Sequence, residues 1–201
     1  LIGCVRRTQG LMVARGNPLR LHSLEQLADG QVRFVNRALG TGTRLLLDEL
    51  LAQQRIARSR IKGYRHTEPS HAAVAQAIAA GQADAGLGIE AAARARGLDF
   101  VPLVTEDYHL VCLKSALEEP AVQALCRVLQ GPDWPGLLLK LPGYQPAQQL
   151  GQVLAMSRLL AWWKYRGEKK PKTRAAEGAR RPRAQSAQER KPQKMSSRPG
   201  R

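Results

Sequence analysis

The chain has 201 residues, with 32 Lys and Arg against 16 Asp and Glu and a net charge of +16. Hydrophobic residues make up 43% of it, which is enough for a core and excludes a wholly disordered protein. Residues 1–163 carry 18 basic and 13 acidic residues, whereas residues 164–201 carry 14 and 3. We therefore expect one folded domain over 1–163 and a disordered, Arg/Lys/Pro-rich tail over 164–201.

The predicted elements begin with a short apolar run at 11–14 and a strand at 32–36, where apolar residues alternate. A glycine-rich turn follows at 40–42, and leucines at helical spacing predict a helix from residue 43 onward. This strand, turn and helix form a first α/β unit.

A second unit begins at 61–64, and Ser70 is the predicted N-cap of an Ala-rich helix that stops at Gly81. Residues 83–89 are short and broken by glycine. Further predicted elements are a helix at 90–96, strands at 98–104 and 108–113 with Pro102 near an edge or bend, and a helix from Pro120 to Gly131. The alternation of strands and helices predicts an α/β fold with a largely parallel sheet.

The sequence does not support a metal site, a dinucleotide-binding site or a catalytic nucleophile. The three cysteines and four histidines are scattered without zinc or redox spacing, so we interpret the cysteines as reduced thiols and expect no metal and no cofactor. A G-x-G-x-x-A pattern at 86–91 lacks a preceding apolar strand, and we interpret it as a coincidence. No nucleophile elbow is present, Ser70 beside His71 is more plausibly a helix cap than a catalytic dyad, and Glu106–Asp107 fits a solvated loop. We expect no enzyme.

No apolar stretch reaches the length of a membrane span and no signal peptide is recognisable, so we expect a cytoplasmic protein. The chain opens on Leu1 rather than Met, directly in an apolar run, which suggests that a longer parent polypeptide has lost its N-terminal part. Residues 153–163 are apolar around Arg158; a terminal helix packed on the domain is favoured over an interfacial membrane helix. The tail could bind nucleic acid weakly and in a salt-sensitive manner.

The turn at 40–42 is the most informative stretch for chemistry. The first turn of a helix has unpaired N–H groups and a partial positive charge, which together favour an anion. Thr41 and Thr43 could add hydroxyl hydrogen bonds, and Arg37 or Arg44 a bidentate contact. A capped helix with solvated arginines explains the turn equally well. The G-K-[ST] ending of a Walker A loop is absent.

Five ordered stretches of the sequence match a known family: LMVA at 11–14, GNPL at 16–19, VRFVNR at 32–37, GTGTRLLLD at 40–48 and GQADAGLGI at 81–89. Through them the chain resembles the PBP-like domain of the periplasmic-binding-protein superfamily, found in bacterial and archaeal cytoplasmic proteins and often attached to a helix-turn-helix domain or to molybdopterin biosynthesis proteins. The resemblance extends to about Tyr144 and leaves the tail out.

The resemblance implies a type 2 fold, in which two α/β lobes clamp a small ligand. Because the family's first strands and helices would lie upstream of Leu1, we expect one nearly complete lobe and part of the other. Phosphate- and molybdate-binding members hold their oxyanion with a Ser/Thr-Gly-Thr turn, which corresponds here to Thr41-Gly42-Thr43. Residues 86–89 look like a crossover at the edge of the cleft, important for close backbone passage. The candidate ligand-binding residues are Asn36, Arg37, Gly40, Thr41, Gly42, Thr43, Arg44, Ser70, His71 and Tyr108.

Two functions remain open on the sequence. The first is a domain that binds and senses a small ligand, an oxyanion such as molybdate or tungstate or a molybdopterin-related metabolite, within a transcriptional regulator or a molybdenum-cofactor-related protein. The expected partners are that ligand and a helix-turn-helix or molybdopterin-biosynthesis domain of the parent protein, and no membrane. The alternative is a basic nucleic-acid-associated protein that acts through its tail.

Overall fold

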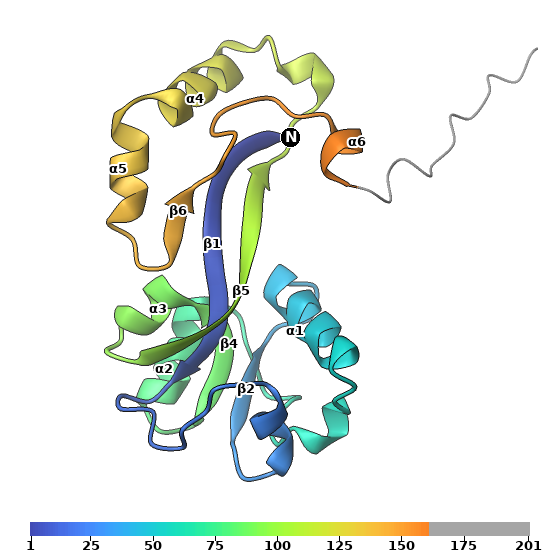
Figure 1. The fold of residues 1–201 in the computed structure, drawn as a ribbon, viewed down its shortest axis with the longest axis vertical. Coiled ribbons are helices and arrows are strands. Elements are labelled where there is room, and N and C mark those ends of the chain that lie inside the picture. The colour runs from blue at the N-terminus through green and yellow to red at the C-terminus, as the bar shows by residue number, and fades with distance from the viewer. Residues whose placement is uncertain (161–201) are drawn as a thin grey trace, which may run out of the picture. The chain divides into compact units, whose positions relative to one another are not determined.

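The computed structural model describes residues 1–160 (Figure 1). The predicted tail over 164–201 and the end of the predicted 153–163 helix lie outside the described residues. Within them, a six-stranded sheet has the order β3-β2-β4-β1-β5, with β6 also paired to β1. The strands are β1 (Ile2–Val13), β2 (Phe34–Arg37), β3 (Thr67–Glu68), β4 (Ala85–Ile89), β5 (Asp99–Leu110) and β6 (Tyr144–Pro146).

The helices follow the strands and cover both faces of the main sheet. Ser70, Pro120 and the turn at 40–42 begin helices as predicted. The helices are α1 (Gly42–Gln53), α2 (His71–Ala79), α3 (Glu90–Arg94), α4 (Pro120–Gln130), α5 (Asp133–Leu139) and α6 (Met156–Leu159), and short 3-10 turns lie at Glu25–Asp29, Arg58–Arg60 and Lys114–Ala116. No helix within residues 1–160 is both long and apolar enough to cross a bilayer.

The sheet is mixed, so the prediction of a largely parallel sheet is wrong. Strand β2 runs parallel to β3 and β4, as the α/β alternation suggests. Strand β1, however, is antiparallel to β4, β5 and β6. Strand β1 pairs with strands more than 70 residues away in the chain. Tertiary contacts decide these pairings, and the local sequence pattern gives no information about them.

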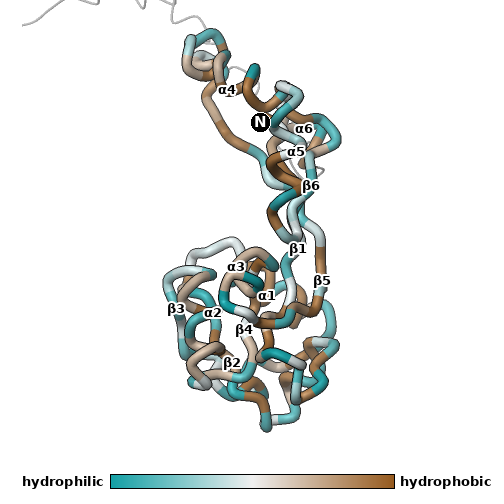
Figure 2. The backbone as a smooth tube through the Cα atoms, turned by 90° about the vertical axis from the view of Figure 1, so that its left-hand side faces the viewer, coloured by the Kyte–Doolittle hydropathy of each residue, from teal (hydrophilic) through white to brown (hydrophobic). Residues whose placement is uncertain are grey.

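Strand β5 is one strand of 12 residues, where the sequence predicts two. It lies beside β1 along the length of both strands (Figure 1), and its apolar run is brown in Figure 2. The position predicted for Pro102 is confirmed: β5 is the last strand in the order, and Pro102 faces Gly10 at a register shift between Gln9 and Gly10. A bulge on an edge strand tolerates a residue that lacks an N–H.

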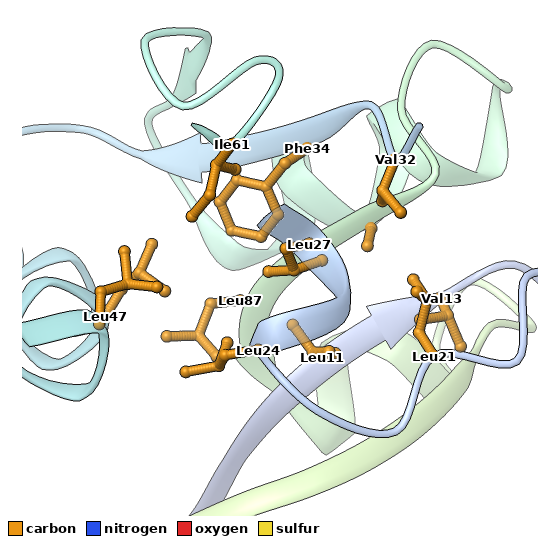
Figure 3. Packing of buried hydrophobic residues seen from close by; sticks show 12 residues of the cluster. Leu11, Val13, Leu21, Leu24, Leu27, Val32, Phe34, Leu47, Ile61 and Leu87 are labelled. Carbon is orange, nitrogen blue, oxygen red and sulfur yellow. The ribbon is translucent and has the colours of Figure 1, made fainter. Parts of the chain in front are cut away.

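The alternation of side chains along the strands divides the core in two. Leu11 and Val13 on β1 pack on the face covered by α1, in the cluster of Figure 3. Met12, between them, packs on the opposite face with α2 and α3. Phe34 and Val35 on β2 divide in the same way. A third cluster joins the start of β1 to α4 and α5. Each buried Leu or Phe contributes about 2 kcal/mol to folding.

Residues 85–89 form a strand at the centre of the sheet, so the prediction of a crossover loop at 86–89 is wrong. Strand β4 pairs with β1 on one side and β2 on the other. The predicted close backbone passage is nevertheless present. A Cβ on Gly86 would lie 2.5 Å from Cγ1 of Val74 and 2.8 Å from the carbonyl oxygen of Val35, so glycine here allows α2 and β2 to approach the strand.

We expect Gly86→Ala to lower the free energy of unfolding by about 2 kcal/mol, because the added methyl overlaps a backbone oxygen and a stiff β-branched side chain. Gly136→Ala is the matched control. Nothing lies within 4 Å of the corresponding Cβ on α5, so this change should be neutral or slightly stabilising. Urea unfolding of both variants measures the difference. Equal stability of the two would contradict the packing described for β4.

Candidate functional site

The candidate site lies where parallel strands end and helices begin. Strand β2 ends at Arg37 and leads to the N-terminus of α1, and β3 ends at Glu68 and leads to the N-terminus of α2. In open α/β sheets, ligands bind at the carboxyl ends of parallel strands, where helix N-termini supply free N–H groups. The turn at 40–42 and the Ser70–His71 pair therefore lie at the same edge of the sheet.

Thr41 is the N-cap of α1, as the interpretation of the turn as a capped helix start requires. Its hydroxyl accepts a hydrogen bond from the Arg44 N–H at 3.4 Å and donates one to the Ala38 carbonyl at 2.8 Å. The N–H groups of Gly42 and Thr43 precede any intrahelical acceptor and have no hydrogen-bond partner among the described residues. The turn thus offers backbone donors to a ligand, while the Thr41 hydroxyl is engaged.

Arg37 is the most unusual side chain of the site. It is only 9% exposed, and its Nε and Nη1 have no hydrogen-bond partner within residues 1–160. Burial lowers the pKa of its guanidinium, because the charged form is less well solvated there than in water. Arginines with this degree of burial are normally paired, so Arg37 is a cation in need of an anion.

His71 opens α2 and lies in the same electrostatic environment. Its Nδ1 is buried and has no partner among the described side chains. Burial lowers the pKa of His71 to about 4, helped by the positive charges of Arg37 and Arg7 and opposed by Glu106. The imidazole is therefore neutral at pH 7, and Nδ1 can accept or donate a hydrogen bond according to the tautomer.

Strands β1 and β5 add three polar residues that the sequence analysis missed. Glu106 forms an ion pair with Arg7 and accepts a hydrogen bond from Nε2 of Gln9 at 2.8 Å. Gln9 is fully buried, and its Oε1 has no partner among the described residues. The prediction that Glu106 is solvated in a loop is wrong, because it lies on β5 facing Arg7 across the ladder. The polar stretch at 6–9, between two apolar runs, is the signal that could have pointed to this group.

Two of the predicted ligand residues are occupied by contacts within the domain. Asn36 donates to the Tyr64 carbonyl at 3.2 Å and accepts from the Arg37 N–H at 2.9 Å. Arg44 pairs with Asp48 at 3.3 Å and lies 4.3 Å from the ring centroid of Tyr64. The Tyr64 hydroxyl also donates to Asp48. These contacts join α1 to the chain segment that follows it.

The remaining predicted residues are more peripheral. Ser70 is exposed and caps α2, accepting a hydrogen bond from the Ala73 N–H at 3.0 Å. Tyr108 is 45% exposed on β5, where its ring lies 5.0 Å from the Arg7 guanidinium. Gly40 is exposed with a φ of +83°, the left-handed conformation that the turn into α1 requires. The ligand roles of these residues stay predictions.

Neither a metal site nor a dinucleotide turn is built from the described residues. Within 1–160, no three His, Cys, Asp or Glu side chains gather closely enough to hold a metal ion. Gly86 and Gly88 of the G-x-G-x-x-A pattern lie inside β4, and α3 begins directly after the strand. The pattern therefore does not form the strand-to-helix phosphate turn of a Rossmann unit.

Comparison with known proteins gives relatives of unassigned function. The chain is 37% identical over 145 residues to the uncharacterized protein YvgK of Bacillus subtilis, an alignment that covers 72% of this chain and 46% of that protein. It is 34% identical over 101 residues to an uncharacterized protein from the 5′ region of a ferredoxin 2Fe-2S gene of Clostridium pasteurianum, covering 50% of this chain and 89% of that one. The chain thus spans about half the length of the Bacillus relative.

Solved structures with a similar fold share little sequence with the chain. Peb3 from Campylobacter jejuni is 18% identical, with a TM-score of 0.54 and coverage of 72% of this chain and 67% of that one. The ancestral amino acid-binding protein AncCDT-1 is 20% identical, with a TM-score of 0.51 and coverage of 68% and 58%. The periplasmic binding protein XoxJ from Methylobacterium extorquens AM1 is 19% identical, with a TM-score of 0.50 and coverage of 73% and 72%.

The family model described as "PBP superfamily domain" matches residues 1–130, well over half of the chain. Together with the mixed α/β sheet and the structural neighbours, this match confirms both the resemblance inferred from the sequence and the type 2 periplasmic-binding-protein-like fold. The chain belongs to the PBP-like family of the periplasmic-binding-protein superfamily.

Proposed function

We propose that this domain binds a small anion, held by Arg37 together with the N-termini of α1 and α2. The observation that carries the proposal is the buried Arg37 guanidinium, whose Nε and Nη1 have no partner among the described residues. A buried charge without a counterion costs several kcal/mol in effective terms. An oxyanion that accepts two hydrogen bonds from the guanidinium removes this cost, so the site is suited to an anion.

The charges around Arg37 support an anionic ligand. Glu106 neutralises Arg7, and His71 is uncharged at pH 7, which leaves Arg37 as the excess charge of the group. The N-termini of α1 and α2 add partial positive charges of roughly half a unit each. Both helices have free first-turn N–H groups at the same edge of the sheet. The site as a whole therefore favours an anion with one or two charges.

The ligand class that we favour is a tetrahedral oxyanion such as molybdate or tungstate, or a molybdopterin-related metabolite that carries a phosphate. The Thr41-Gly42-Thr43 turn supports this class, because it presents two free N–H groups at the edge of the sheet where β2 ends at Arg37. An organic acid with a donor group is the second candidate, favoured by the unpaired Oε1 of Gln9. Structures of the fold include PEB3 with bound L-phospholactate and a protein named as amino acid-binding, so both classes belong in the test.

The proposal extends to the protein of which this domain is part. PBP-like domains often accompany helix-turn-helix or molybdopterin-biosynthesis domains, and a sensing role in a cytoplasmic regulator or a molybdenum-cofactor-related protein follows from that resemblance. Ligand binding then shifts the domain between two states, and the attached domain responds to the difference in affinity between them. The chain binds its ligand without transforming it.

Thermal unfolding of the chain with millimolar molybdate, tungstate, phosphate, sulfate and small hydroxy or amino acids tests the ligand class. A ligand that binds only the folded state raises the unfolding midpoint, by about 5 to 10 °C at a hundredfold excess over Kd. We expect a specific rise with one oxyanion, and calorimetric titration then gives the stoichiometry. A rise only with the organic acids would select the second candidate. A cooperative transition that no anion shifts would refute anion binding.

We expect Arg37→Met to abolish the midpoint rise caused by the ligand and to raise the free energy of unfolding of the ligand-free chain by about 1 kcal/mol. The physical reason is that Met fills a similar volume without an unpaired buried charge. Arg96→Met is the matched control, because Arg96 is exposed and distant in sequence from the site. It should leave both quantities unchanged. A variant at Arg37 that still responds to the anion would contradict the assignment.

We expect His71 to make stability depend on pH between about 4 and 6.5. The unfolded chain binds a proton on this histidine near its ordinary pKa of 6.5, whereas the folded chain does so only near 4. Stability is therefore complete above pH 6.5 and falls as the pH drops, by about 2 kcal/mol after allowance for partial exposure. His71→Gln should remove this part of the decline, and His22→Gln, at an exposed position, should not. Denaturation curves at several pH values decide the point.

A further inference from the structure

A second surface carries the positive charge of the domain. The segment between α1 and β3, residues 55–66, is called the basic loop below. It holds five cations and no acidic residue. The rest of residues 1–163 contains equal numbers of basic and acidic residues, so this loop accounts for the whole charge excess of the predicted domain. The five cations are Arg55, Arg58, Arg60, Lys62 and Arg65, all of them exposed.

The backbone of the basic loop is held in place at several points. Ile61 is buried in the core cluster beneath it, and Ile56 packs against the same cluster. The Lys62 carbonyl accepts a hydrogen bond from the Phe34 N–H at 2.8 Å, which ties the loop to β2. Gly63 has a φ of +89°, and a Cβ there would lie 2.1 Å from the Phe34 carbonyl oxygen. The cations are therefore presented by an ordered backbone, which reduces the entropy lost on binding.

Most of these cations are free for an external partner. Arg58 pairs with Asp48 at 3.5 Å, but Asp48 also pairs with Arg44. Arg55, Arg60 and Arg65 have no ion pair within residues 1–160. Such a concentration of unpaired like charges is unfavourable in isolation and is relieved by a polyanion.

Two hollows in the surface share Arg65 and contain suitable donors. One is lined by Arg58, Ser59, Ile61, Gly63, Tyr64, Arg65 and His66. The other is lined by Leu39, Arg44, Arg65 and Thr67. Guanidinium, imidazole and hydroxyl groups are the donors that bind phosphate oxygens. Neither hollow contains Arg37 or His71. The second hollow reaches Leu39 and Arg44, which flank the turn into α1, whereas the first hollow is lined only by residues 58–66 and lies outside the proposed ligand site.

We propose that the basic loop docks on the phosphate backbone of a nucleic acid, with phosphate groups at the hollows beside Arg65. The chemistry of the loop favours this partner over an acidic protein. Its two large aliphatic side chains, Ile56 and Ile61, face inward. Leu39, which is 79% exposed, is the one large aliphatic side chain that lines the hollows from outside the loop, and a single such side chain does not form the apolar centre that stable protein interfaces require. Arginine contacts to phosphates need no such anchor, and they bind without regard to sequence.

The test is the affinity of the full chain for a fluorescein-labelled 20-base-pair DNA duplex, measured by anisotropy at several salt concentrations. Each phosphate contact contributes about 0.9 to the slope of log affinity against log salt. We expect Arg55→Gln, Arg60→Gln and Arg65→Gln together to reduce that slope by about 2 to 3 and to weaken binding at least about tenfold at 100 mM salt. The corresponding triple Lys variant should retain the slope. Unfolding midpoints verify that both variants are folded.

The matched control removes the same charge elsewhere. Arg15, Arg96 and Arg127 are exposed and have no ion pair among the described residues, and their joint change to Gln should alter the slope by less than about 1. The basic residues beyond position 163 are present in every variant, so the comparison isolates the loop. Equal losses in the two Gln variants would overturn the proposal. The proposal would also be overturned if the triple Gln variant of the basic loop lost more affinity for poly-glutamate than for DNA.

Discussion

The antiparallel pairing of β1 is the constraint on which the rest of the described structure depends. This 12-residue strand lies between β4 and β5 and also pairs with β6. Its last residues divide the core between the two faces of the sheet, its first residues begin the third core cluster, and its middle carries Arg7 and Gln9. Because side chains alternate along a strand, the pairing of this one strand holds both cores and the polar group in place.

The sequence predicts the elements whose causes are local. Thr41 and Ser70 cap α1 and α2, and Pro120 begins α4, because caps and proline act within a few residues. The central strand β4 and the unbroken β5 are not predictable in this way. From the sequence alone, Gly86 and Gly88 resemble a loop. In the structure, side chains at these two positions would overlap Val35, Met12 and α2. Long-range packing decides these cases.

In the candidate site, too, local sequence signals predict some features and only the fold creates the others. Arg37 and the Thr41 turn are adjacent in the chain, so strand-end and helix-start signals are sufficient to suggest them. The contact of Arg7 with Glu106 joins residues 99 positions apart, and only the β1–β5 ladder brings it into the site. Burial of Arg37 without a partner is likewise a property of the fold, since the same residue type at an exposed strand end would be unremarkable. The proposed anion therefore depends on a fact that sequence patterns do not contain.

The two register shifts in the β1–β5 ladder have a consequence for how this family can diverge. They lie between Gly3 and Val5 and between Gln9 and Gly10, on either side of the polar middle of β1. Substitution at a position in that middle changes one side chain. Loss or gain of one residue there would turn every side chain on one side of the change to the opposite face, and would direct Arg7 or Gln9 away from Glu106. Evolution can thus change the chemistry of this strand one residue at a time, whereas a change in its length requires a compensating bulge like the two already present.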